Sequence, residues 1–179
     1  MITLILGPMF SGKTTQLLAY ERRFMIAKKT FVIIKFRGDT RYSETKVMNH
    51  DGKYNISCDV LQATRLDEID EKVLEPYECI LIDEGQFFID LAWFCKKYTK
   101  TKNIVISGLS GDYQRKPFQP ISEAMSLADK IEHFHSICNQ CGKDAAFTAR
   151  ISDEHEQTVI GGSEKYQPRC GECFEWVNM

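Results

Sequence analysis

Eight residues near the N-terminus have the types and spacing of a phosphate-binding turn. Gly7, Pro8, Met9, Phe10, Ser11, Gly12, Lys13 and Thr14 fit the pattern G-x-x-x-x-G-K-[S/T], and an apolar run precedes them. The glycines let backbone N–H groups close around phosphate oxygens, and a helix N-terminus after the turn adds a favourable dipole. We expect Lys13 to hold the β- and γ-phosphates of ATP and the Thr14 hydroxyl to ligate Mg²⁺. The alternative is a strand–helix turn that merely contains glycines.

A pair of carboxylates, Asp83 and Glu84, ends a second apolar run. If residues 79–82 form a strand of a parallel sheet, both acids lie at the carboxyl edge, where ligands of open α/β folds bind. Alternation along a strand predicts that the two side chains point to opposite faces and have different roles. We therefore assign Asp83 to Mg²⁺ and Glu84 to the phosphoryl acceptor. The alternative is a solvated acid pair at the end of a strand, which would be the ordinary interpretation if no phosphate-binding turn preceded it.

Four of the seven cysteines form two CxxC pairs, Cys138 with Cys141 and Cys170 with Cys173. Four thiolates with no open coordination position suit a structural zinc ion, which would also stabilise a short polar tail. The alternatives are two redox pairs or unrelated thiols. The other three cysteines, at positions 58, 79 and 95, fall in strand or helix patterns and are expected to be small core residues.

The elements that must position these groups can be read from hydrophobic periodicity. Short apolar runs at 2–6, 31–34, 79–82 and 104–106 predict buried parallel strands, and 13–27 and 86–100 have helical periodicity. The alternation predicts an α/β fold, a P-loop NTPase-like parallel sheet flanked by helices. We expect a P-loop kinase domain over 1–136 and a small C-terminal zinc-binding lobe with a substrate-binding loop over 137–179. Residues 37–52 predict a long loop or a hairpin.

Composition limits the classes of protein that remain. The 179-residue chain has 23 basic and 25 acidic side chains, a net charge of −2, which argues against a protein that coats nucleic acid. No long apolar run and no leader segment is evident, so we expect no membrane contact and a cytoplasmic location.

Several segments together resemble one known family, the type II thymidine kinases. The matching stretches are GPMFSGKTT at 7–15, DTRYS at 39–43, IDEGQFF at 82–88, QRKPF at 114–118, VIGGSEKY at 159–166 and both CxxC pairs. They occur in the family's order and cover nearly the whole chain. DEGQFF, QRKPF and VIGG together are much more specific than the phosphate-binding turn alone.

The resemblance implies an ATP:thymidine 5′-phosphotransferase with a structural zinc, usually a homotetramer and often inhibited by dTTP. It implies that Glu84 is the general base at the 5′-hydroxyl and that Arg41 contacts phosphate, beside Lys13. The implied walls of the nucleoside site are Phe87, Leu109, Tyr113 and Phe118. Around the thymine methyl it places Met9, Thr148 and Tyr166, and along the base edge the backbone of Val159, Ile160 and Gly161.

Two positions depart from the family pattern. Ser110 stands where the family commonly has an acid, and Tyr113 stands where phenylalanine is usual. Two other classes stay open: a P-loop ATPase that acts on nucleic acid through its zinc lobe and, because of Ser110, a regulatory nucleotide binder without catalysis. The first would need a basic, aromatic strand-binding face, and the tail after residue 137 has only scattered Lys and Arg.

Overall fold

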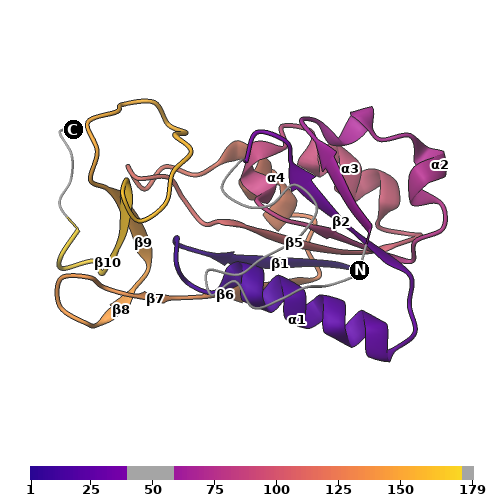
Figure 1. The fold of residues 1–179 in the computed structure, drawn as a ribbon, viewed down its shortest axis with the longest axis horizontal. Helices are drawn as coiled ribbons and strands as arrows, with labels where there is room; N and C mark the ends of the chain where they lie inside the picture. The colour runs from indigo at the N-terminus through magenta and orange to yellow at the C-terminus, as the bar shows by residue number, and fades with distance from the viewer. Residues whose placement is uncertain (40–58, 175–179) are drawn as a thin grey trace.

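The computed structural model describes residues 1–39 and 59–174 and shows a parallel sheet covered on both faces (Figure 1). The six strands of the sheet are β1 (Ile2–Gly7), β2 (Phe31–Phe36), β3 (Asp59–Ala63), β4 (Cys79–Ile82), β5 (Asn103–Leu109) and β6 (Lys130–His133). They run in the order β3-β2-β4-β5-β1-β6, and all neighbouring pairs are parallel. The predicted parallel α/β sheet flanked by helices is confirmed.

The helices divide between the two faces of the sheet. They are α1 (Lys13–Ile26), α2 (Glu71–Leu74), α3 (Leu91–Tyr98) and α4 (Gln119–Met125), with 3-10 turns η1 (Leu66–Glu68) and η2 (Gly85–Phe87). In Figure 1, α1 lies below the sheet and α3 and α4 lie above it. Alternate residues of β1 follow this division, because Ile5 packs with the α1 residue Leu17 whereas Leu4 packs with Leu91 of α3.

The strands are apolar along their whole length because both faces are buried. Every residue of β1 and of β4 is buried, as expected for interior parallel strands covered by helices. Because β5 lies between β1 and β4, the chain segments that leave these three strands meet at one edge of the sheet. The phosphate-binding turn follows β1, and Asp83 and Glu84 follow β4, so the topology brings both predicted groups to that edge.

One predicted helix begins in the wrong place. We expected a helix over 86–100, but α3 spans Leu91–Tyr98 and only the short η2 turn lies before it. Phe88 is extended and fully buried, with its ring 5.7 Å from Phe36, and this packing interrupts the helical path. Asp90 uses its carboxylate to accept the backbone N–H groups of Leu66 and Asp67. Tertiary packing therefore overrides the local apolar periodicity at this point.

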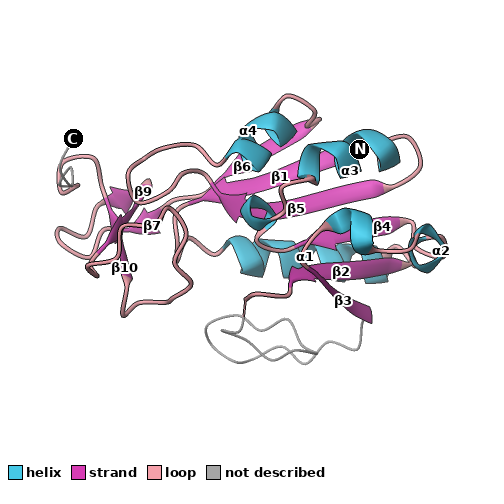
Figure 2. Ribbon diagram, turned by 90° about the horizontal axis from the view of Figure 1, so that it is seen from above, coloured by secondary structure: helices cyan, strands magenta, loops and turns pink. Residues whose placement is uncertain are grey.

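The C-terminal part of the described chain forms a separate small lobe of two hairpins. Its strands are β7 (Ser136–Ile137), β8 (Asp144–Ala145), β9 (Phe147–Arg150) and β10 (Tyr166–Arg169). β7 pairs with β8 and β9 with β10, both antiparallel, and the lobe lies at one end of the main sheet in Figure 2. None of the helices that the structure describes is both long enough and apolar enough to cross a bilayer.

Candidate active site

The phosphate-binding turn joins β1 directly to α1. Gly7 has no room for a side chain, since a Cβ there would lie 2.6 Å from the Phe134 carbonyl oxygen. Gly12 caps the N-terminus of α1 with φ 83°, a left-handed conformation that favours glycine. These two glycines let the turn fold tightly against the strand and leave the N–H groups at the start of α1 facing outward from the sheet edge.

Lys13 is the buried cation of the turn. Its side chain is only 9% exposed, and Nζ donates a hydrogen bond of 2.6 Å to the Pro8 carbonyl oxygen. Ser11 Oγ donates to the same carbonyl at 2.9 Å. The amine is therefore held over the turn at the helix N-terminus, where two sources of positive potential coincide.

The two acids after β4 adopt different environments. Asp83 is buried, and the Ser107 hydroxyl donates to its Oδ1 at 2.5 Å. Burial, followed by the neighbouring Glu84 carboxylate, raises the pKa of Asp83 to about 6. Because β4 ends at Ile82 and Glu84 has φ 54°, the strand alternation used to separate the two side chains does not apply here. Both residues line the same cleft.

Glu84 is held in a conformation that is rare for a residue with a side chain. A left-handed φ outside glycine costs of order 1 kcal/mol and persists where the surrounding structure enforces it. The side chain is held as well: Gln86 Nε2 donates to Glu84 Oε2 at 2.6 Å, and Gln86 Oε1 accepts the Leu109 N–H at 3.0 Å. Gln86 therefore fixes the carboxylate relative to the end of β5.

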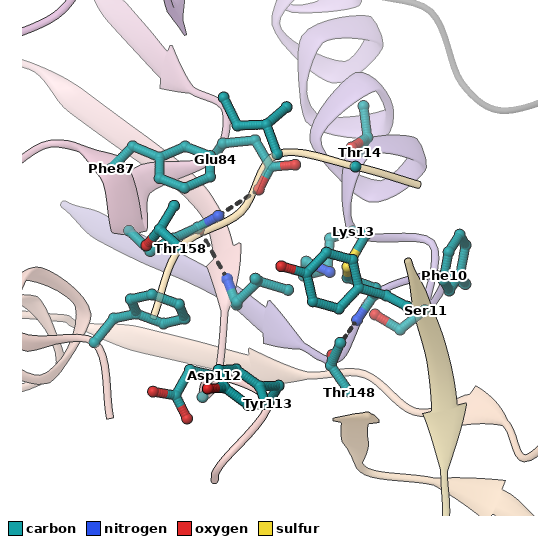
Figure 3. A pocket seen from close by; sticks show the side chains of 18 of the residues that line it. Phe10, Ser11, Lys13, Thr14, Glu84, Phe87, Asp112, Tyr113, Thr148 and Thr158 are labelled. Carbon is teal, nitrogen blue, oxygen red and sulfur yellow. Dashed lines mark hydrogen bonds between the residues drawn. The ribbon is translucent and has the colours of Figure 1, made fainter. Parts of the chain in front are cut away.

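One cleft connects the phosphate-binding turn with Glu84 and with the loop between β9 and β10. It contains about 970 Å³ of space free of protein atoms, its open mouth included. Figure 3 shows Phe87 on one side of the cleft and the turn residues Ser11 and Lys13 on the other, with Asp112 and Tyr113 below. The dashed bonds in Figure 3 include Met9 N to Thr148 Oγ1, 2.9 Å, which ties the turn to β9.

Most residues singled out from the sequence line this cleft. They are Met9, Phe10, Ser11, Gly12, Lys13, Thr14, Asp83, Glu84, Phe87, Leu109, Tyr113, Phe118, Thr148, Val159, Ile160, Gly161 and Tyr166. Gly7 and Pro8 belong to the turn but not to the lining. Arg41 and the rest of the DTRYS stretch after Asp39 lie outside the described residues, as do Cys58 and most of the predicted 37–52 loop.

Several lining residues were not predicted, among them Gln86, Asp112, Gln157 and Thr158. Asp112 is 4% exposed; its Oδ1 accepts the backbone N–H groups of Gln114 and Lys116, and its Oδ2 accepts from Gln157 Nε2 at 2.9 Å. Their positions in the sequence could have indicated two of these residues, since Gln86 lies within the family-like stretch at 82–88 and Asp112 lies beside the stretch at 114–118. The predicted departure Ser110 is not among the lining residues, although its neighbours Leu109 and Gly111 are.

The four cysteines of the CxxC pairs converge in the C-terminal lobe. The Sγ atoms of Cys138, Cys141, Cys170 and Cys173 all lie within 4.8 Å of one another, and Cys141 and Cys170 are 3.6 Å apart. A tetrahedral zinc with Zn–S bonds of about 2.3 Å needs S–S separations of about 3.8 Å. All four are free thiols. The donor set and spacing fit a zinc ion, and this cluster could hold one.

A parallel sheet with a phosphate-binding turn after an interior strand, and two acids after the strand two places away, defines a P-loop nucleotide-binding protein. Similarity to known proteins identifies the family within this class. The family model described as thymidine kinase matches residues 1–174, so the chain belongs to the thymidine kinase family.

Curated relatives agree along nearly the whole chain. The chain is 41% identical to the thymidine kinase of Rabbit fibroma virus (strain Kasza) over 174 residues, which cover 97% of this chain and 95% of the relative. It is 40% identical to the thymidine kinase of Raccoon poxvirus and 39% identical to that of Vaccinia virus (strain Ankara), each over 97% of this chain and 96% of the relative.

Proposed function

We propose that this chain transfers the γ-phosphoryl group of ATP to the 5′-hydroxyl of thymidine. The observation that carries the proposal is the single cleft that joins Lys13 and Thr14 to Glu84 and then to the loop at 157–161. A phosphate site and an alcohol site must adjoin for in-line transfer, and a cleft shared by these residues supports that arrangement. Membership of the thymidine kinase family supports the same reaction.

Electrostatic stabilisation is assigned to the phosphate-binding turn. The transition state of phosphoryl transfer spreads negative charge over three equatorial oxygens, so fixed positive groups contribute most. Lys13 and the N-terminus of α1 are such groups, and Arg41 is proposed as a further phosphate contact. Thr14 and Asp83 would hold Mg²⁺, which supplies charge neutralisation when bound; hydroxyl and carboxylate oxygens in one cleft suit that hard cation.

Glu84 is proposed to take the proton from the 5′-hydroxyl. Its carboxylate lies in the cleft and is held by Gln86, so it is positioned before substrate binds. A positioned base contributes about 10²–10⁴-fold to rate. The walls of the nucleoside site are assigned to Phe87, Leu109, Tyr113 and Phe118, which line the cleft beyond Glu84.

Base recognition is assigned to the loop at 159–161, beside Met9, Thr148 and Tyr166. Thymine presents N3–H as a donor and O4 as an acceptor, whereas cytosine reverses both, so the wrong base leaves buried polar groups unpaired. A pocket for the 5-methyl group alone discriminates by about 1–3 kcal/mol. Deoxyuridine is therefore expected to be a weaker substrate and deoxycytidine a very poor one.

The finer proposals concern organisation and regulation. We assign residues 1–136 to the kinase domain and 137–179 to a lobe in which Cys138, Cys141, Cys170 and Cys173 hold a structural zinc. The lobe supplies part of the nucleoside site through β9, β10 and the loop between them. A homotetramer and inhibition by dTTP are proposed from the family resemblance. A cytoplasmic location is proposed as well.

The experiment is transfer of labelled γ-phosphate to thymidine by Glu84→Gln and by a matched control, Glu78→Gln. Glu78 lies just before β4, at the opposite end of that strand from Glu84, and is exposed. We expect Glu84→Gln to bind ATP normally but to lose at least about 100-fold in kcat, with the control unchanged. An unchanged kcat in Glu84→Gln would remove Glu84 from this role. ATP hydrolysis stimulated by DNA or RNA, without transfer to thymidine, would favour the nucleic-acid ATPase instead.

A further inference from the structure

The loop between β9 and β10 has few backbone hydrogen bonds of its own. At its base Ile151 N–H donates to Lys165 O at 2.8 Å, and Lys165 and Tyr166 donate to Gly162 O. Within the described part of the chain, residues 154–159 take part in no backbone-to-backbone hydrogen bond. Backbone carbonyls that are not paired with backbone donors require side chains or water. The conformation of this segment therefore depends on what its carbonyl groups contact.

One guanidinium group supplies three of these contacts. Arg150, the last residue of β9, is 8% exposed. Its Nη1 donates to Glu154 O at 3.0 Å and to Glu156 O at 2.5 Å, and its Nη2 donates to Gln157 O at 3.3 Å. A planar, permanently charged group with several N–H donors can contact successive carbonyl oxygens of one curved segment.

Two tyrosines extend the same set of contacts. Arg150 Nη2 donates to the Tyr166 hydroxyl at 2.7 Å, and that hydroxyl donates to Val159 O at 2.7 Å. Tyr113 OH donates to His155 O at 2.8 Å, and the Arg150 guanidinium lies 3.8 Å from the Tyr113 ring centroid. The carbonyls of 154, 155, 156, 157 and 159 thus all accept from Arg150 or from a tyrosine that contacts it.

Arg150 does not line the cleft, but both tyrosines do, and so does the segment 157–161 that follows these carbonyls. We propose that Arg150 is a positioning residue that determines nucleoside specificity: it sets the backbone path of 154–159 and thereby the polar edge presented to the base. The proposal rests on the proposed transfer to thymidine. It goes beyond it by placing the origin of base discrimination in a side chain outside the cleft.

The ion pair between Lys165 and Glu154 is a second charged contact of the same loop, and we expect it to contribute less to the loop conformation than the Arg150 hydrogen bonds. Lys165 Nζ lies 2.6 Å from Glu154 Oε1, but both side chains are about one-third exposed. Exposed ion pairs contribute little because solvent screens them and their side chains lose entropy. Arg150 is 8% exposed and donates to three carbonyl oxygens at once, so its loss removes a set of partly buried, charge-assisted hydrogen bonds and carries a larger cost. Removing Arg150 should therefore affect the loop far more than removing Lys165.

The test compares Arg150→Met with Arg150→Lys and with the control Arg169→Met. Arg169 lies on β10 of the same hairpin, and its guanidinium hydrogen bond is to Gln167 Oε1, away from the loop. For each protein, kcat and KM would be measured for thymidine and deoxycytidine, together with ATP affinity and zinc content. Deuterium exchange of the amides at 152–161, without any ligand, would report the conformation of the loop itself.

For Arg150→Met we expect the thymidine KM to rise by about 30-fold or more, as when a set of charge-assisted hydrogen bonds is lost. Its preference for thymidine over deoxycytidine should fall, the 152–161 amides should exchange faster, and ATP affinity and zinc content should stay unchanged. Arg150→Lys should be intermediate, because an ammonium group reaches fewer carbonyls. The control should match the wild type.

A thymidine KM and a base preference within about threefold of wild type in Arg150→Met, measured with the same kinetics, would overturn the proposal. If Arg150→Met does not fold, an Arg150→Lys variant with wild-type kinetics and wild-type exchange would overturn it equally. Failure of the wild-type protein to phosphorylate thymidine would instead contradict the proposed function, and the exchange comparison would still decide whether Arg150 organises the loop.

Discussion

Gln86 and Glu84 are joined by a hydrogen bond of 2.6 Å from the amide Nε2 to the carboxylate Oε2. The other end of the same amide accepts the Leu109 N–H, so Gln86 bridges the segment after β4 and the end of β5. The proposed general base is thus held by a side chain that is itself anchored to a neighbouring strand. The position of the carboxylate follows from the packing of two strands as well as from its place in the chain.

Replacing Gln86 with leucine should lower kcat without weakening ATP binding. Leucine has a similar side-chain volume, but it cannot hydrogen-bond to the Glu84 carboxylate and it leaves the Leu109 N–H without its acceptor. A base displaced by about 1 Å costs up to about 100-fold, so we expect a decrease of about 10- to 100-fold. Steady-state kinetics would measure it, with Gln119→Leu on the exposed start of α4 as the control. A wild-type kcat would show that Glu84 needs no such support.

Replacing Lys13 with methionine should abolish most of the phosphoryl transfer. The buried amine lies in the turn where the γ-phosphate is expected, and loss of one fixed donor to developing charge costs about 10²–10³-fold. Thymidine affinity, measured by calorimetry, should change little. Lys72→Met, on the surface of α2, should behave like the wild type. Thymidine binding that fell in parallel with kcat would point to loss of structure in place of loss of the phosphate contact.

Replacing Cys170 with serine should lower the zinc content, the melting temperature and the thymidine affinity together. Phe174 follows Cys173, its ring lies 5.7 Å from Phe147, and the Arg115 guanidinium lies 3.8 Å from the Phe147 ring. These contacts connect the cysteine cluster to the loop after Tyr113. A less ordered cluster should therefore also disturb the nucleoside site and lower its affinity for thymidine. Zinc analysis, thermal unfolding and calorimetry would test this. Cys95→Ala in α3 should keep the zinc, and full zinc content in Cys170→Ser would contradict the assigned ligands.

Glu21 should make the stability of the protein decrease between about pH 5 and pH 7. It lies on α1, is 0% exposed, and both carboxylate oxygens are buried without a hydrogen-bond partner among the described residues. Burial raises its pKa from 4.5 to about 7. The folded state therefore keeps a proton that the unfolded state releases, so the stability contributed by Glu21 is fully present below pH 4.5 and is lost as pH rises through about 7.

The shift corresponds to a loss on the order of 3 kcal/mol at pH 8. Glu21→Gln cannot ionise, so its stability relative to wild type should increase by about 2.5 kcal/mol between pH 5 and pH 8, since a smaller part of the loss has already occurred at pH 5. Urea unfolding at both pH values would measure the difference, and effects of pH on the rest of the protein cancel in the comparison. Glu78→Gln, at an exposed acid, should show no such trend. A constant difference between Glu21→Gln and wild type would contradict the buried, uncompensated acid.

Some features follow from residues that are adjacent in the chain, and these were predictable. The turn at 7–14 is one contiguous segment whose glycines and lysine define its conformation and chemistry together, and the predicted strand–turn–helix is present. The buried strands β2, β4 and β5 contain the predicted apolar runs because both faces of a parallel sheet exclude polar residues. The family match and the convergence of the four cysteines likewise agree with the motifs.

Other features arise only when distant segments pack together. The left-handed backbone of Glu84, the extended Phe88 that delays α3, and the contact of Asp112 with Gln157 have no periodic signal, since each depends on a partner from another element. Nothing in the sequence pattern distinguishes Arg150 from other strand residues, because its role depends on the carbonyl groups of the following loop that the fold brings to its guanidinium. The sequence alone thus determined the family, the sheet and the reactive residue types, because these depend on local pattern. The tertiary structure decided how the Glu84 carboxylate and the loop between β9 and β10 are held, because buried polar side chains must find hydrogen-bond partners wherever the chain brings them.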